Sequence, residues 1–167
     1  MSRPRSPPRL NFTGTVDGTG PDYDQWDGYP AERKVLLDFV RDEGIRNVVV
    51  LSGDVHVALA AELGEEAGND PVAVEFVNTS LTSQNLDDKM GWLRRSDSIA
   101  VELELVRGLL SIRYVDLDSH GFSIVDLDRE RLRFEWWTVE EIHERAPGAQ
   151  LTAAWSVRAN QPRLVPA

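Results

Sequence analysis

The order of hydrophobic and polar residues in the first third of the chain predicts a helix followed by a strand. Pro30 suits the first turn of a helix, and Gly44 is a residue type that commonly ends one. Between them, four apolar residues recur at helical spacing, namely Val35, Leu36, Phe39 and Val40. The uninterrupted apolar run within Asn47–Leu51 is typical of a central strand that is buried on both faces. Helix, short loop and strand together predict half of an α/β layer.

The pattern farther along the chain is that of strands. Four segments carry β-branched or alternating apolar residues at similar spacing: 72–77, 99–105, 112–117 and 122–127. The segment 126–130 is a polar turn, and Leu132, Phe134 and Trp136 alternate with charged residues after it. The two flanks of this turn should pair as an antiparallel hairpin. The last three or four strands are expected to form a meander.

The two ends of the chain predict little regular structure. Residues 1–22 are rich in glycine and proline and are expected to be flexible or extended. Residues 138–145 predict a short acidic helix, and the segment from Ala159 predicts a tail. The sequence therefore predicts an α/β (α+β) fold at 23–146, followed by an extension or tail at 147–167.

Composition narrows the classes of function. The chain has 167 residues, the length of one ordinary domain. Its 28 acidic and 18 basic side chains give a net charge of −10, which would repel the phosphate backbone of a nucleic acid. A nucleic-acid scaffold is therefore excluded. Cysteine is absent, so a disulfide framework is excluded and any metal must be held by oxygen or imidazole ligands.

Hydropathy predicts neither a membrane span nor an export signal. No stretch approaches the roughly 18 apolar residues that a membrane helix needs. The segment after Met1–Arg9 is polar, where a secretory signal would have its apolar core. As written, the sequence would be that of a cytoplasmic chain, but its localisation stays open.

Polar side chains appear abruptly where the predicted strand Asn47–Leu51 ends. Asp54 and His56 are two residues apart there, so their side chains would point to the same side if strand geometry continued. A carboxylate and an imidazole at the carboxyl end of a strand can bind one or two divalent or trivalent cations. The alternative is an ordinary loop aspartate next to a surface histidine, and spacing alone does not decide between the two.

An aromatic and charged cluster leads into the predicted helix. Arg33 could grip a phosphate oxygen, and Tyr29 could close a site around the substrate. The structural alternative is that Trp26 and Tyr29 fasten the loop to the helix while Arg33 pairs with a nearby carboxylate. The residue types alone favour the structural alternative.

Three further polar features are weaker. The run Asn78–Ser83 could supply an amide ligand or hydroxyl donors to the same site, and ordinary turn chemistry explains it equally well. His120 and Gly121 end a turn between two strands, where local geometry alone could explain a histidine. His143 lies in an acidic segment and receives no role.

Four segments, in this order and spacing, resemble the C-terminal half of the PhoD-like alkaline phosphatase family: Asp24–Arg33, Asn47–His56, Glu75–Ser80 and His120–Phe122. The resemblance covers about residues 20–140. It implies a calcineurin-like metallophosphoesterase fold, in which two sheets form a sandwich flanked by helices. It also implies hydrolysis of phosphate monoesters and diesters by a hydroxide generated at a pair of metal ions, iron and calcium.

The resemblance assigns roles to individual residues. Asp54 and His56 match the metal-binding motif Gly-Asp-x-His of the family. His120 matches its His-Gly-aromatic motif near the active site and is a catalytic candidate that contacts metal or substrate. Tyr29 and Arg33 belong to the first motif and are candidates for substrate binding.

Family enzymes carry further metal ligands upstream of the first motif, so the resemblance implies an incomplete metal centre in this chain. A two-metal site needs on the order of six protein ligands. We therefore expect a phosphoric ester hydrolase of PhoD type whose isolated chain shows little activity. It should expose apolar surface beside Val48 and Val50, and associate with a polypeptide that supplies the other half or with itself. The alternative is a non-catalytic remnant or a module that binds a phosphorylated ligand or a partner.

Overall fold

The computed structural model describes residues 26–64, 70–108, 111–143, 145 and 148–167. Its helical elements are η1 (Trp26–Gly28), α1 (Pro30–Asp42), α2 (Leu86–Met90) and α3 (Asp97–Gly108). Its strands are β1 (Val48–Ser52), β2 (Ala58–Leu63), β3 (Ala73–Val77), β4 (Ile112–Asp116), β5 (Gly121–Leu127), β6 (Arg131–Val139), β7 (Ala149–Arg158) and β8 (Gln161–Pro166). No helix in this described part is long and apolar enough to cross a membrane.

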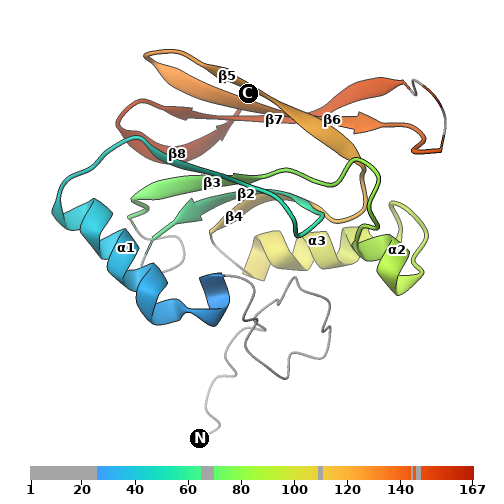
Figure 1. Cartoon of the computed structure of the whole chain (residues 1–167), viewed down its shortest axis with the longest axis horizontal. Coiled ribbons are helices and arrows are strands. Elements are labelled where there is room, and N and C mark those ends of the chain that lie inside the picture. The colour runs from blue at the N-terminus through green and yellow to red at the C-terminus, as the bar shows by residue number, and fades with distance from the viewer. Residues whose placement is uncertain (1–25, 65–69, 109–110, 144, 146–147) are drawn as a thin grey trace, which may run out of the picture.

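The strands form two four-stranded sheets that face each other (Figure 1). The first sheet has the order β1-β3-β2-β4, with β1 parallel to β3 and with β2 antiparallel to both of its neighbours. Strands β1, β3 and β4 therefore run in one direction and end at the same edge of the sheet. The second sheet is an antiparallel meander, β5-β6-β7-β8. The predicted α/β class and two-sheet sandwich with a C-terminal meander are confirmed.

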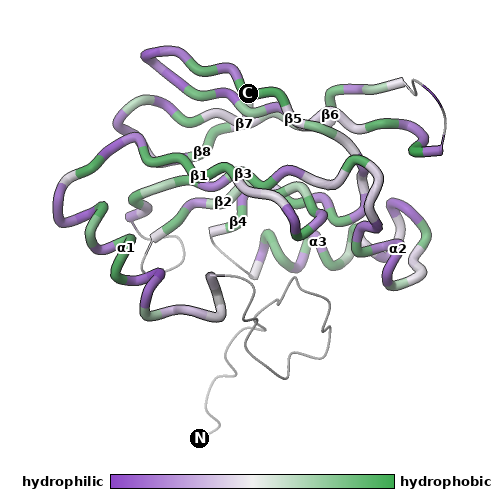
Figure 2. Tube along the Cα trace, in the orientation of Figure 1, coloured by the Kyte–Doolittle hydropathy of each residue, from purple (hydrophilic) through white to green (hydrophobic). Residues whose placement is uncertain are grey.

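Side chains on the two faces of β2 divide the interior into two apolar layers. Ala58 and Ala60 face the second sheet, where Phe134 and Trp136 of β6 pack in the same cluster. Leu59 and Ala61 belong to the other cluster, which includes Leu105 of α3. Figure 2 shows the hydrophobic stretches following the strands of the first sheet. Both faces of the first sheet are therefore covered, by the second sheet on one side and by α3 on the other.

Helix α1 forms as predicted, but only part of the expected apolar face is buried. Gly44 has a φ of +62° just after the helix, a left-handed conformation that glycine adopts without strain. Leu37 and Val40 are the buried residues of the helix. Val35 remains 70% exposed and Phe39 55% exposed. The helix packs through a narrower stripe than its sequence predicts.

Strand β1 corresponds to the predicted strand Asn47–Leu51, but the prediction of a central position is wrong. It stands at the edge of its sheet, and its second hydrogen-bonding side has no partner strand among the described residues. Val50 is 37% exposed and Leu51 55% exposed. A β-branched run indicates a strand with two apolar faces. Whether that strand is central or at the edge of the sheet depends on which other strands pair with it. The expected exposure of apolar surface beside Val50 is confirmed.

Residues 99–105, predicted as a strand, lie in helix α3. The buried residues of this helix are Ser98, Glu102 and Leu105, which share one helical face. Glutamate and leucine are also good helix formers. The alternation of apolar and acidic residues at period two was therefore a misleading signal, because the same residues satisfy the helical spacing.

The hairpin of β5 and β6 forms as predicted, but two segments after it do not have their predicted structure. Thr138 and Val139 end β6, and the described residues from 140 to 145 form bends rather than an acidic helix. The segment from Ala159 is part of the second sheet and not a tail, because Leu164 of β8 is only 7% exposed. The prediction for residues 1–22 lies outside the described residues, and the domain boundaries stay predictions.

Strand β8 is fastened to the first sheet by a buried carboxylate. The Leu164 N–H donates to Glu62 Oε1 at 2.9 Å. Arg113 and Arg163 donate to the other oxygen of Glu62, at 2.7 and 3.2 Å. Because the glutamate lies on β2 and its partners on β4 and β8, this cluster joins the two sheets, which local sequence patterns do not reveal.

Candidate functional site

The common edge at which β1, β3 and β4 end carries most of the candidate residues. Register pairs Ser52 of β1 with Val77 of β3, and the Asn78 N–H donates to the Ser52 carbonyl at 2.9 Å. The segments 53–57 and 78–85 therefore leave the sheet side by side. The Gly121 N–H donates to the Ser80 carbonyl at 3.0 Å, which brings the segment after β4 to the same edge. This edge is referred to below as the sheet-edge site.

Asp54 and His56 lie in the loop between β1 and β2 rather than on a continued strand. Both have left-handed backbones, with φ of 72° and 60°. The alternation of a strand therefore does not apply to them, since the strand ends at Ser52. Asp54 is exposed and makes no hydrogen bond or ion pair with any described residue, whereas His56 is half-buried. The carboxylate is thus open to a ligand, and the imidazole is held in place.

The contact that holds His56 also fixes its protonation pattern. Its Nδ1 lies 2.7 Å from the backbone carbonyl oxygen of Gln84. A carbonyl oxygen can only accept, so Nδ1 carries a proton, and in the neutral ring the lone pair is then on Nε2. Nε2 meets no partner among the described residues. Histidine ligands of metals are commonly oriented by this kind of hydrogen bond from the second ring nitrogen. The ring of His56 therefore has the chemistry of a metal ligand.

His120 lies at the same edge and is almost fully buried. Its Nδ1 is 3.3 Å from Ser80 Oγ, and its Nε2 is 3.4 Å from Asp88 Oδ2. The Ser80 hydroxyl in turn donates to Asn85 Oδ1 or to the Ser83 carbonyl, so its oxygen can accept from the ring. Both ring nitrogens thus face oxygen atoms that can accept a hydrogen bond, and these contacts orient the ring.

The glycine after His120 is required by close packing. A Cβ at Gly121 would lie 2.1 Å from the Trp137 carbonyl oxygen, far inside contact distance. The Val139 N–H also donates to the His120 carbonyl at 2.9 Å. The His-Gly pair therefore joins the sheet-edge site to the second sheet, and only glycine allows β5 and β6 to approach so closely there.

The run Asn78–Ser83 contributes structure more than free ligands. Asn78 donates to the Thr79 carbonyl, and its side-chain oxygen accepts from Ser123. Thr79 donates to the Ser119 carbonyl at 2.8 Å. The amide of Asn78 is thus occupied, and these side chains tie the segments after β3 and β4 together.

Tyr29 and Arg33 are not brought to the sheet-edge site. With Trp26 and Glu32 they line a shallow depression beside the start of α1. Figure 1 shows α1 at the left end of the view and α2 at the right end, below the first sheet. Their role in substrate binding stays a prediction. His143 is exposed, and its N–H donates to Glu141, in keeping with the absence of an assigned role.

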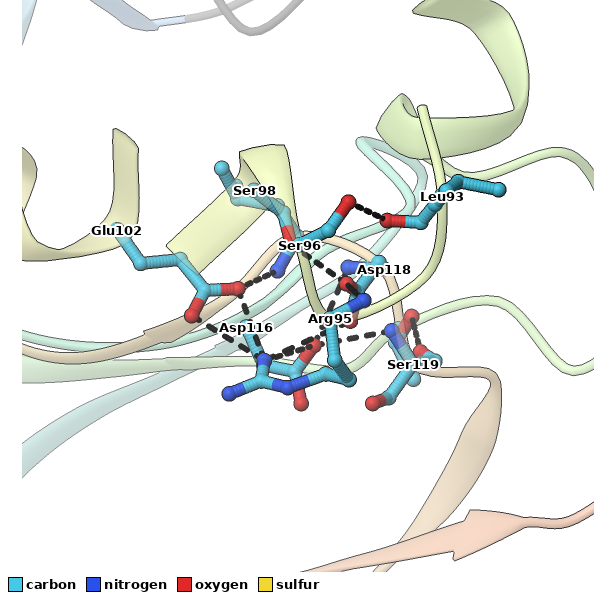
Figure 3. Close-up of polar contacts among 10 residues, drawn as sticks. Leu93, Arg95, Ser96, Ser98, Glu102, Asp116, Asp118 and Ser119 are labelled. Atoms are coloured by element: carbon cyan, nitrogen blue, oxygen red, sulfur yellow. Dashed lines mark hydrogen bonds and ion pairs between the residues drawn. The ribbon is translucent and has the colours of Figure 1, made fainter. Parts of the chain in front are cut away.

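A second polar cluster, which the sequence analysis missed, lies next to this edge (Figure 3). Ligand atoms of Glu102, Asp116 and Asp118 all lie within 4.8 Å of one another, close enough to hold a metal ion. The guanidinium of Arg95 already occupies the position of a cation: its Nη1 is 3.1 Å from Glu102, 3.6 Å from Asp116 and 3.5 Å from Asp118. These four residues are called the arginine–carboxylate cluster below.

Electrostatics support this assignment of the cation. Burial raises the pKa of Glu102, and the neighbouring carboxylates add to the rise against the opposing charge of Arg95. Burial also acts to raise the pKa of Asp118, but hydrogen bonds from Ser98 and from the Arg95 N–H outweigh it and hold that pKa below its usual range. The carboxylates raise the pKa of Arg95 further, despite its partial burial. The guanidinium is thus the permanent positive charge within the cluster.

One feature of the sequence hints at this cluster without defining it. Asp116 lies near the end of the predicted strand 112–117 and Asp118 directly after it, much as Asp54 and His56 follow theirs. Arg95, however, is 23 residues before Asp118, in a segment without a clear pattern. The pairing could not be inferred because it depends on how α3 packs on β4.

Comparison with known proteins identifies the family. The family model described as PhoD-like phosphatase matches residues 10–136. Alkaline phosphatase D of Bacillus subtilis (strain 168) is 44% identical over 63 residues, which cover 36% of this chain and 11% of that protein. A solved structure titled "Structure of PhoD" matches with a TM-score of 0.70 and 26% identity, over 86% of this chain and 26% of that chain.

The chain therefore belongs to the PhoD-like phosphatase family, as its four motifs indicated. It spans about a quarter of the length of the solved structure that it matches. Phosphate ester hydrolysis is the activity of that family, and what this chain contributes to it is a separate question.

Proposed function

We propose that this chain supplies one part of the active site of a metal-dependent phosphoric ester hydrolase, a phosphatase or phosphodiesterase. Asp54 and His56 are the proposed ligands of its metal. The observation that carries the proposal is the hydrogen bond of His56 Nδ1 to the Gln84 carbonyl, which leaves Nε2 of the neutral ring available as a ligand in the same loop as the exposed carboxylate of Asp54. This donor pair of oxygen and imidazole nitrogen fits first-row transition metals and, through the carboxylate, calcium. Iron and calcium, the metal pair that the family resemblance implies, are the proposed ions.

A cation bound there would activate water as a nucleophile and offset the charge of the phosphate oxygens. The protein's own contribution is to hold the ligands and to contact the substrate. His120 is proposed as a catalytic residue that contacts metal or substrate, because it lies at the sheet-edge site and Ser80 and Asp88 orient its ring. Tyr29 and Arg33 are proposed to contact the phosphate ester from the depression beside the start of α1.

The metal centre of this chain is proposed to be incomplete. Within the described residues, the arginine–carboxylate cluster is the one group of at least three potential ligands, and its cation position is taken by Arg95. Further ligands would come from other regions of a PhoD-like enzyme, which would also cover exposed apolar residues such as Leu51. The alternative of a non-catalytic module that binds a phosphorylated ligand predicts binding without turnover.

The proposal is tested by metal binding and by hydrolysis. Titration calorimetry with Mn²⁺, used as a probe for divalent ions, should detect binding to the wild-type chain that is lost in the double variant D54A/H56A. His143→Ala is the matched control, because this histidine is exposed and lies outside the site. Equal binding by the double variant would reject the two ligands.

Hydrolysis separates the full enzyme from the partial one. With added iron and calcium, the isolated chain should hydrolyse p-nitrophenyl phosphate and its bis ester close to the background rate. A fast rate that D54A/H56A abolishes would show that the metal centre is complete. Binding of inorganic phosphate without turnover would favour the non-catalytic module.

A further inference from the structure

We propose that Arg95 is a built-in cation that takes the place of a metal in the arginine–carboxylate cluster and thereby positions His120. The catalytic consequence rests on the proposed function, but the effect on the position of His120 does not. Arg95 is a positioning residue in this proposal, since it touches neither His120 nor a substrate.

Arg95 serves the cluster through both its backbone and its side chain. Its φ of 54° is left-handed, which is uncommon for a residue with a side chain. In this conformation its N–H donates to Asp118 Oδ2 at 2.6 Å. Its Nη1 donates to both oxygens of Glu102, at 3.1 and 3.2 Å. A single residue thus fixes one carboxylate of the segment after β4 and one of α3.

The carboxylates in turn hold the backbone that leads to His120. Glu102 Oε1 accepts from the Leu117 N–H at 2.9 Å. Asp116 Oδ1 accepts from the N–H groups of Asp118 and Ser119, at 3.1 and 2.9 Å. Three successive N–H groups, at residues 117, 118 and 119, are therefore bonded to the carboxylates that surround Arg95. The next residue is His120.

Removal of the guanidinium would leave three buried carboxylates within 4.8 Å of one another without a counter-charge. Like charges at that separation inside a protein cannot all stay ionised, so at least one takes up a proton or a cation, or the group moves apart. A protonated carboxyl is a weaker acceptor for the backbone N–H groups. The segment 117–119 then loses its fixed geometry, and the ring of His120 shifts from Ser80 and Asp88.

Imidazole resonances provide a direct readout, because the chain has only three histidines, His56, His120 and His143. In Arg95→Met, which keeps an unbranched side chain without the charge, the ring signals of His120 should shift by more than their line width. Those of His143 should not move. Arg113→Met is the matched control, because it removes an equivalent bond to a buried carboxylate, Glu62, away from His120. Unchanged His120 signals in Arg95→Met would overturn the proposal.

A second measurement remains informative if Arg95→Met folds poorly. Calcium should raise the melting temperature of Arg95→Met, because the ion replaces the guanidinium among the carboxylates. Two proteins are compared, one with Arg95→Met and one with Arg95, and both carry D54A/H56A so that calcium cannot bind at the sheet-edge site. The protein that keeps Arg95 should show no change in melting temperature on addition of calcium. The absence of a calcium effect in Arg95→Met would count against a cation position in the cluster. Failure of Mn²⁺ to bind at Asp54 and His56 would reject the proposed function. The imidazole shifts and the calcium-dependent melting temperature would still test the role of Arg95.

Discussion

Two neighbouring regions of the first sheet both place carboxylates after a strand, yet they differ in what those carboxylates can do. In the sheet-edge site, Asp54 is exposed and unpaired among the described residues, and Nε2 of His56 in the same loop has no partner among them. In the arginine–carboxylate cluster, three acids converge on one guanidinium and on backbone N–H groups. The second region has more acids, and Asp118 Oδ1 has no hydrogen-bond partner among the described residues, but the guanidinium of Arg95 already lies among the three carboxylates. Room for an external cation, and not the number of acids, therefore distinguishes the candidate metal site from the cluster that contains its own cation.

The largest expected difference between the two regions is in stability. Asp118→Ala removes a fully buried carboxylate that accepts from Ser98 and from the Arg95 N–H. It should lower the free energy of unfolding by about 1–3 kcal/mol, the usual cost of leaving buried hydrogen-bond donors without an acceptor. Asp54→Ala, at an exposed position, should change it by about 0.5 kcal/mol or less. Urea denaturation measures both values, and similar losses in the two variants would remove the distinction.

A smaller effect is expected in the pH dependence of stability at Glu62, another carboxylate enclosed by arginines. Burial acts to raise its pKa, but the hydrogen bond from Arg113, that from the Leu164 N–H and the charges of Arg113 and Arg163 outweigh burial and lower the pKa. Its contribution to stability is therefore fully present above the ordinary glutamate pKa of about 4.3. It is lost as the pH falls through the lowered value in the folded state.

Glu62→Gln tests this sign. Its free energy of unfolding should lie below that of the wild type at pH 7, and the gap should narrow on acidification below about pH 4. Denaturant unfolding at a series of pH values measures the gap. A gap that widens as the pH falls would contradict the assigned direction of the shift.

The smallest expected effect concerns metal affinity at the arginine–carboxylate cluster. Glu102→Gln should leave the affinity for Mn²⁺ within about twofold of the wild type, because Arg95 already fills the cation position in the cluster. His56→Ala removes a proposed ligand and should lower that affinity at least about tenfold. Loss of a residue that only orients a metal ligand already costs about 10–100-fold in affinity. Calorimetry on the two variants compares the regions directly. A large loss in Glu102→Gln would move the metal site to the cluster.

Much of the fold follows from local patterns. The helix that starts at Pro30, the strands at 72–77 and 112–117 and the hairpin around 126–130 were all predictable, because their signals lie within a few residues. The helix at 99–105 was missed because its apolar residues fit both periods. Strands β7 and β8 were missed because the sequence there was interpreted as a tail, while their stability depends on pairing with β6 and on Glu62.

For the site, the sequence alone determined the family, through four ordered motifs, and the residue types available for metal chemistry, Asp54, His56 and His120. Only the tertiary structure decided which of these groups are free to act. The edge position of β1, the tautomer of His56 and the pairing of Arg95 with Asp118 all depend on partners between 23 and 28 residues away along the chain. Residue types and spacing are carried by the chain itself, whereas hydrogen-bond partners and counter-charges exist only once distant segments pack together.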